Sequence, residues 1–113
     1  MTRLAIIFSF VVVLCACGSG TDVRFKNSSE YPLEAVELSG SGFKASLGTV
    51  APGRSLTAEI YPSGETGLAV SFTAKGRRYT YEPQDYFEAG GYRVSAKVDG
   101  SLAVSVETET TLY

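Results

Sequence analysis

Apolar and polar residues alternate along most of the chain after residue 22. Six segments place an apolar side chain at every second position, which is the period of a β-strand. They are Val23/Phe25, Phe43/Ala45/Leu47, Leu56/Ala58/Ile60, Leu68/Val70/Phe72/Ala74, Tyr92/Val94/Ala96/Val98 and Leu102/Val104/Val106. The positions between them are charged or hydroxylated, as at Arg24, Lys44 and Glu107. We therefore expect each strand to have one buried face and one wet face, as in an antiparallel sheet that covers a core.

Turn-forming residues separate these segments at short intervals. Lys75-Gly76 and Asp99-Gly100 each lie between two alternating runs, and each predicts a tight two-residue hairpin turn. Asn27-Ser28-Ser29 matches a glycosylation sequon, but we interpret it as a turn as well. Clusters of Gly, Pro and Ser mark the remaining connections, so that the chain is divided into short strands.

The spacing of these turns predicts an all-β domain over residues 23–113 with seven or eight short strands. Such a pattern is typical of a small antiparallel β-sandwich, which we expect to be immunoglobulin-like, and a small barrel is the alternative. The segment 33–38 is ambiguous, because its apolar phase slips between Ala35 and Val36. Either a β-bulge or a helical turn would explain the slip.

Residues 1–16 have the organisation of a signal peptide. Arg3 precedes an unbroken run of apolar or small residues from Leu4 to Leu14, and small residues follow. The run is well short of the roughly 20 residues that a transmembrane helix needs. The alternative is an N-terminal strand or core helix, although the domain downstream already has a complete strand pattern.

The end of this run, Leu14-Cys15-Ala16-Cys17-Gly18, resembles the lipobox of bacterial lipoproteins. The resemblance covers the leader alone and implies that the chain is cut before Cys17, which then carries diacylglycerol. Cys15 would leave with the leader, and residues 17–22 would form the lipidated cysteine and a flexible tether. Because Gly18 stands where an aspartate tends to signal inner-membrane retention, the resemblance favours the outer membrane, facing the periplasm.

Composition narrows the chemistry that the exported part can perform. The chain has 113 residues, no histidine and a formal net charge of -2. Without histidine it lacks the commonest general base and metal ligand, and Cys15 with Cys17 cannot complete a tetrahedral zinc site. Acidic groups outnumber basic ones, which argues against nucleic-acid binding. We therefore expect no catalytic residues, no metal and no cofactor.

The densest polar and aromatic stretch runs from residue 77 to residue 92, and two interpretations of it compete. In the first, five residues form a contact patch for a protein or glycan. They are Arg77, Arg78, Tyr81, Tyr86 and Tyr92. In the second, the tyrosines pack within or at the end of the sandwich, and the charges are solvated. Glu82, Asp85 and Glu88 could also offer oxygens to calcium, but their spacing does not follow a known calcium loop.

These observations favour a lipid-anchored envelope protein with a small, non-catalytic β domain. We expect it to contact the membrane through the lipid at Cys17 and to bind another envelope or secreted protein, as an inhibitor or immunity protein would. One alternative is an envelope glycan hydrolase that uses a carboxylate pair among Glu82, Asp85 and Glu88. Another is a purely structural surface lipoprotein.

Overall fold

The computed structural model describes residues 20–111, which form eight strands and no helix. The strands are β1 (Thr21–Asn27), β2 (Leu33–Gly40), β3 (Phe43–Val50), β4 (Ser55–Ile60), β5 (Thr66–Ala74), β6 (Arg77–Phe87), β7 (Tyr92–Val98) and β8 (Val104–Thr110). Nothing in this range could cross a membrane as an apolar helix. The expected signal peptide and the lipid attachment at Cys17 lie outside the described residues.

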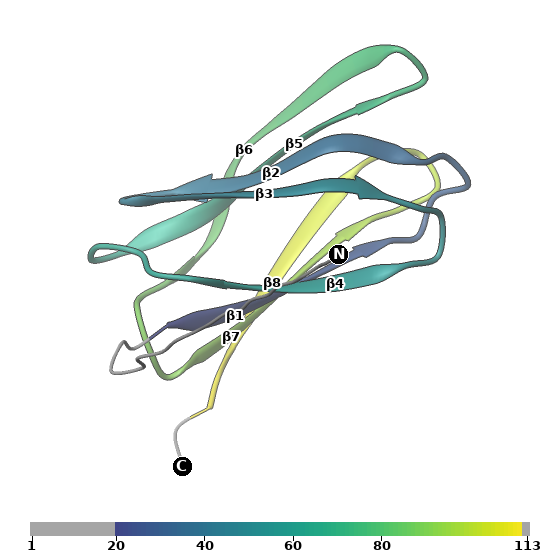
Figure 1. Cartoon of the computed structure of the whole chain (residues 1–113). Coiled ribbons are helices and arrows are strands. Elements are labelled where there is room, and N and C mark those ends of the chain that lie inside the picture. The colour runs from purple at the N-terminus through teal and green to yellow at the C-terminus, as the bar shows by residue number, and fades with distance from the viewer. Residues whose placement is uncertain (1–19, 112–113) are drawn as a thin grey trace, which may run out of the picture.

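The strands form two four-stranded sheets packed face to face (Figure 1). Sheet A has the order β4-β1-β7-β8, and sheet B has the order β3-β2-β5-β6. The predicted all-β sandwich with seven or eight strands is therefore confirmed. Three hairpins, β2–β3, β5–β6 and β7–β8, stay within one sheet, whereas the other connections cross from one sheet to the other.

One pair of neighbours, β1 and β7, is parallel, which the alternating pattern alone did not indicate. Both strands start at the same end of the sandwich, where the chain returns from β6. The Thr21 hydroxyl donates to the carbonyl oxygen of Glu88 at 3.2 Å and accepts the N–H of Gly90 at 3.2 Å. These bonds hold the start of β1 against the segment that leads into β7. They also explain why β1 includes Thr21 and Asp22, which the sequence had assigned to the tether.

The core lies between the sheets and is built from the alternating apolar positions. Its largest fully buried side chains are Phe25, Phe72, Phe87, Leu33, Leu38 and Leu68. Every strand contributes an inward-facing side chain, and all of this packing lies within the described range. Because the sandwich encloses its own hydrophobic core, we expect residues 20–113 to fold as an independent unit.

A buried asparagine joins the two sheets at one end. Asn27, at the end of β1, is fully buried and donates from Nδ2 to the carbonyl oxygens of Tyr31 at 2.8 Å and Val50 at 3.0 Å. Its Oδ1 accepts the N–H and the hydroxyl of Ser29 at 2.9 and 2.7 Å. The Asn27 amide therefore supplies hydrogen-bond partners to backbone groups where the chain passes from sheet A to sheet B. The chain bends at Ser29, as the turn interpretation expected, but Asn27 itself is the last residue of β1.

Of the two predicted two-residue hairpin turns, one is confirmed and one is wrong. Ala74 pairs with Arg77, so Lys75-Gly76 is a two-residue turn, and φ is 55° at Lys75 and 74° at Gly76. Positive φ at both central residues is what a type I′ hairpin requires. The prediction for Asp99-Gly100 was wrong, because β7 ends at Val98 and pairs there with Val104, the first residue of β8.

Hydrogen bonds to the Asp99 side chain stabilise the longer connection over residues 99–103. The Asp99 carboxylate accepts the backbone N–H groups of Ser101 at 2.9 Å and Ala103 at 3.0 Å, and the Ser101 hydroxyl at 2.8 Å. Leu102, predicted as a strand residue, lies instead in this loop with φ of 68° and is 4% exposed. The loop thus places the Leu102 side chain against the end of the core.

The ambiguous segment 33–38 belongs to β2 and contains a β-bulge. The register of β2 against both β3 and β5 shifts between Leu33 or Glu34 and Glu37. Ala35 has φ of 48°, so the backbone there is left-handed and the apolar phase moves by one residue. The bulge alternative is therefore confirmed, and Leu33, Val36 and Leu38 all face the core.

Candidate functional site

The five residues of the predicted contact patch do not lie together. Four of them are on β6 and Tyr92 begins β7. From Arg77 to Tyr86 an extended strand covers about 30 Å, so the arginines and Tyr86 lie near opposite ends of the sandwich. Alternation along β6 also sends neighbouring side chains to opposite faces of sheet B. The five side chains therefore lie in three places: on or near the outer face of sheet B, inside the sandwich, and at the end where β1 begins.

Arg78 lies on the outer face of sheet B, where it is held by groups of its own sheet. Its guanidinium donates to the Ala35 carbonyl oxygen at 3.0 Å, to the Thr73 hydroxyl at 3.2 Å and to the Ser71 hydroxyl at 2.9 Å. The Glu37 carboxylate is 4.0 Å away. Arg78 therefore satisfies the carbonyl that the bulge exposes. Arg77 is exposed next to the hairpin tip.

Tyr81 faces the other way, into the sandwich. Its ring stacks on Phe72 with centroids 6.1 Å apart, and Tyr79 stacks on the same ring at 5.3 Å. The Tyr81 hydroxyl donates to the Leu102 carbonyl oxygen at 2.6 Å. Burial, with smaller contributions from Tyr79 and Asp99, raises the pKa of Tyr81. These contacts tie the edge of sheet B to sheet A.

Tyr86 and Tyr92 do lie near each other, at the end of the sandwich where β1 begins. Tyr86 is 45% exposed, and its hydroxyl donates to the Glu88 carboxylate at 2.5 Å. This hydrogen bond is the main cause that raises the pKa of Tyr86, and Glu65 and Tyr92 are close enough to add to the shift. This end therefore presents a small surface of tyrosine and carboxylate groups.

Of the carboxylates considered for glycan hydrolysis or calcium binding, Glu82 and Asp85 lie on β6 and Glu88 follows its last residue. Glu82 and Asp85 are exposed, and Asp85 has φ of 64° where the pairing of β5 with β6 is irregular. Glu88 is held by Tyr86. Within residues 20–111, no three Asp, Glu, His or Cys side chains are grouped as metal ligands.

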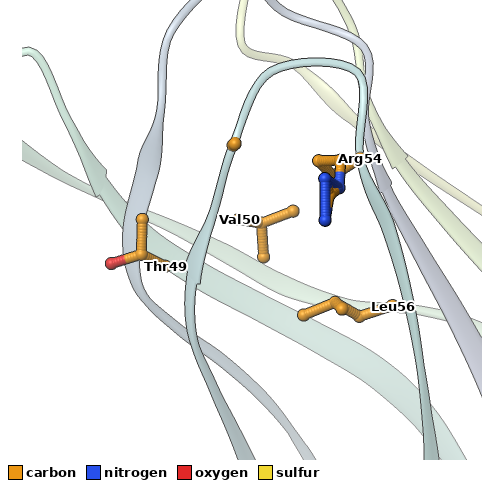
Figure 2. A pocket seen from close by; sticks show the side chains of 5 residues that line it. Thr49, Val50, Arg54 and Leu56 are labelled. Carbon is orange, nitrogen blue, oxygen red and sulfur yellow. The ribbon is translucent and has the colours of Figure 1, made fainter.

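A small pocket lies at a different place, under the connection between β3 and β4. It has a volume of about 190 Å³ and is lined by Thr49, Val50, Ala51, Arg54 and Leu56. In Figure 2, Leu56 extends toward Val50 between the two limbs of the connection. Leu56 remains 39% exposed although its position in β4 faces inward, because β4 is an edge strand. None of the acidic residues of β6 lines this pocket.

Comparisons with known proteins add a fold relationship and no function. No model of a known protein family matches the chain, and no curated protein matches it either. Among solved structures, the chain is similar to the NMR structure of a protein from Eubacterium rectale, with a TM-score of 0.58 and 17% sequence identity. The match covers 81% of this chain and 90% of that one. At this identity the likeness concerns the sandwich fold alone.

Sequence patterns did not reveal two features of the structure. The first is the buried hydrogen-bond centre at Asn27, because a short polar run is typical of any solvated turn. The second is the position of strands at sheet edges, which depends on pairing between segments far apart in the chain.

Proposed function

We propose that the chain is a lipid-anchored protein of the bacterial envelope whose β-sandwich binds another envelope or secreted protein and catalyses no reaction. The lipobox resemblance at Leu14-Cys15-Ala16-Cys17 supports the anchor. Extracytoplasmic folding is consistent with the domain's construction, because its stability within residues 20–111 rests on packed apolar side chains and needs no thiol.

The position of β1 is the structural observation that carries this proposal. Thr21 opens β1 at one end of the sandwich, and three residues separate it from Cys17 in the sequence. Four residue steps from Cys17 to Thr21 span at most about 14 Å, so a lipid on Cys17 would hold this end next to the bilayer. Three connections, 28–32, 51–54 and 99–103, and the β5–β6 hairpin lie at the opposite end (Figure 1). They would therefore face away from the membrane.

Fractionation of cells that express the full chain tests the anchor. We expect the wild type to enter the outer-membrane fraction and to incorporate an alkyne analogue of palmitate, whereas Cys17→Ser should lose the label and retain the leader. Cys15→Ser is the matched control, because this cysteine would be removed with the leader. A label that persists in Cys17→Ser, or a wild type without label, would overturn the proposal.

A further inference from the structure

The four edge strands of the sandwich differ in how well they could accept an added strand. An edge presents unpaired N–H and C=O groups, which proteins commonly block with proline, bulges or covering segments. β6 contains Pro83 and a left-handed residue at Asp85, and its pairing with β5 is irregular. β3 contains Gly48 with φ of 72° and pairs irregularly with β2. Both edges of sheet B are therefore interrupted.

The two edges of sheet A both pair regularly, but they differ in how the chain enters and leaves them. The connections before and after β4 cross to sheet B and bracket its six residues, Ser55–Ile60. β8 is instead joined to β7 by a hairpin, and β6 of the other sheet lies beside it. Its seven residues pair with β7 without a register shift. β8 is thus the edge that a further strand could approach.

The direction of the backbone groups in β8 follows from the hydrogen bonds at its ends. Asp99 N–H donates to the carbonyl of Ala103, and Thr111 N–H donates to the carbonyl of Gly91. In an antiparallel pair such bonded residues alternate, so the odd-numbered residues of β8 bond to β7. The even-numbered residues turn their N–H and C=O outward. Val104 agrees, because its carbonyl accepts Gln84 Nε2 of β6 at 3.3 Å.

Beyond Val104, the outward backbone groups of Val106 and Thr108 have no partner among residues 20–111. Their side chains are half-buried, Val106 packs against the core, and β6 lies beside β8 at a seam between the sheets. A strand added at this point would gain main-chain hydrogen bonds and cover that seam. This geometry is the one by which extended peptides join a sheet edge.

The side chains of β8 define which strand would fit. Glu107 and Glu109 are exposed on the outer face of sheet A, where Glu107 lies opposite Ser95 and Glu109 opposite Arg93 of β7. The inward positions hold Val106 and Thr108. Opposite charges on adjacent strands stabilise pairing, and like charges oppose it. A second copy joined antiparallel through β8 would place carboxylates beside carboxylates. The charge pattern therefore disfavours self-pairing and favours a strand with basic residues at alternate positions.

We propose that β8 binds an extended segment of a partner protein, in which Lys or Arg alternates with apolar residues, as an added strand of sheet A. This inference rests on the proposed function insofar as the partner belongs to the envelope or is secreted. It replaces the contact patch of Arg77, Arg78, Tyr81, Tyr86 and Tyr92 by a surface on another strand. The basic side chains would lie beside Glu107 and Glu109, and the apolar ones would cover the seam.

The test uses residues 20–113 and two synthetic seven-residue peptides, one alternating Lys with Val and one alternating Glu with Val. We expect the Lys–Val peptide to bind about tenfold or more tightly than the Glu–Val peptide, because only the first complements the carboxylates. In NMR titrations the amide shifts should centre on Val106 and Thr108. Equal binding of both peptides, no binding, shifts centred on β4, or a dimer formed through β8 would each overturn the inference.

Two pairs of variants separate strand addition from nonspecific charge attraction. Thr108→Pro removes an outward N–H and should abolish binding, whereas Thr108→Val keeps the N–H and should bind like the wild type. Replacing Glu107 and Glu109 by Lys should reverse the preference between the peptides, while Glu59→Lys on β4 should not. Retained binding in a folded Thr108→Pro variant would contradict the inference. Because this domain lacks Cys17, the result is independent of the lipid-anchor test.

Discussion

At the scale of single residues, the polar groups that are most buried hold the fold together. Asn27 satisfies two carbonyl oxygens and two groups of Ser29 where the chain passes between the sheets. Arg78 has a similar role on the surface, because it bonds the carbonyl of Ala35 in the bulge. These side chains would have been difficult to distinguish by sequence from solvated turn or surface residues, since their partners are set by the fold.

Replacing Asn27 by Ala should destabilise the domain strongly. The substitution leaves the carbonyl oxygen of Val50 and the N–H of Ser29 without this side-chain partner, and a buried group left unsatisfied costs about 1–3 kcal/mol. We expect the free energy of unfolding, measured by urea denaturation, to fall by about 2–4 kcal/mol. Ser28→Ala, at an exposed neighbour, is the control and should change it by less than about 0.5 kcal/mol. Equal effects would argue against the Asn27 network.

At the scale of elements, the sequence predicted strands well and connections less well. The period of two in segments such as Leu68–Ala74 was enough to predict a strand, because the positions that face the core carry apolar residues. The Lys75-Gly76 turn was also predictable, because its neighbours are in register. The Asp99 loop was not, since its length depends on a side chain that captures backbone N–H groups. The parallel pairing of β1 with β7 depends on contacts across the whole chain.

The bulge in β2 predicts an unusual response to a residue that normally favours strands. Ala35 is exposed and has φ of 48°, a conformation that β-branched residues adopt poorly. We expect Ala35→Val to lower the free energy of unfolding by about 1–2 kcal/mol. Glu34→Val, at the exposed neighbouring position, should have a much smaller effect. Stabilisation by Ala35→Val in denaturant titrations would contradict the left-handed conformation.

The Asp99 loop predicts a dependence of stability on pH. Hydrogen bonds from Ser101 and Ala103 hold the pKa of Asp99 below its ordinary value of 3.8. The folded state thus binds this proton less readily than the unfolded state, so the contribution is complete above pH 3.8 and is lost as the pH falls through the lower folded pKa. Asp99→Ala should reduce the melting temperature at pH 7, and the difference from wild type should shrink at acidic pH. A difference that is constant with pH would refute this role.

At the scale of the whole molecule, charge is distributed unevenly between the two ends of the sandwich. More carboxylates lie near the end where β1 begins, among them Asp22, Glu59, Glu65, Glu88 and Glu109, than near the other end, which has Glu30, Glu34 and Asp99. Most basic residues lie toward the other end, among them Lys26, Arg54, Lys75, Arg77 and Lys97, whereas Arg93 and Lys44 lie toward the acidic end. An anchor at Cys17 would bring the acidic end next to the bilayer, where anionic lipids would repel it. The domain would then stand with its basic end, and β8 along its side, accessible to partners.

Mass spectrometry of the mature N-terminus tests the central claim most directly. The full chain would be expressed in a bacterium, extracted from membranes with detergent and digested before analysis. Our account predicts an N-terminal peptide that begins at Cys17 and carries the mass of a diacylglyceryl group on its sulfur. A peptide that still begins at Met1, or one that contains Cys17 with an unmodified thiol, would contradict the lipid anchor and the location that follows from it.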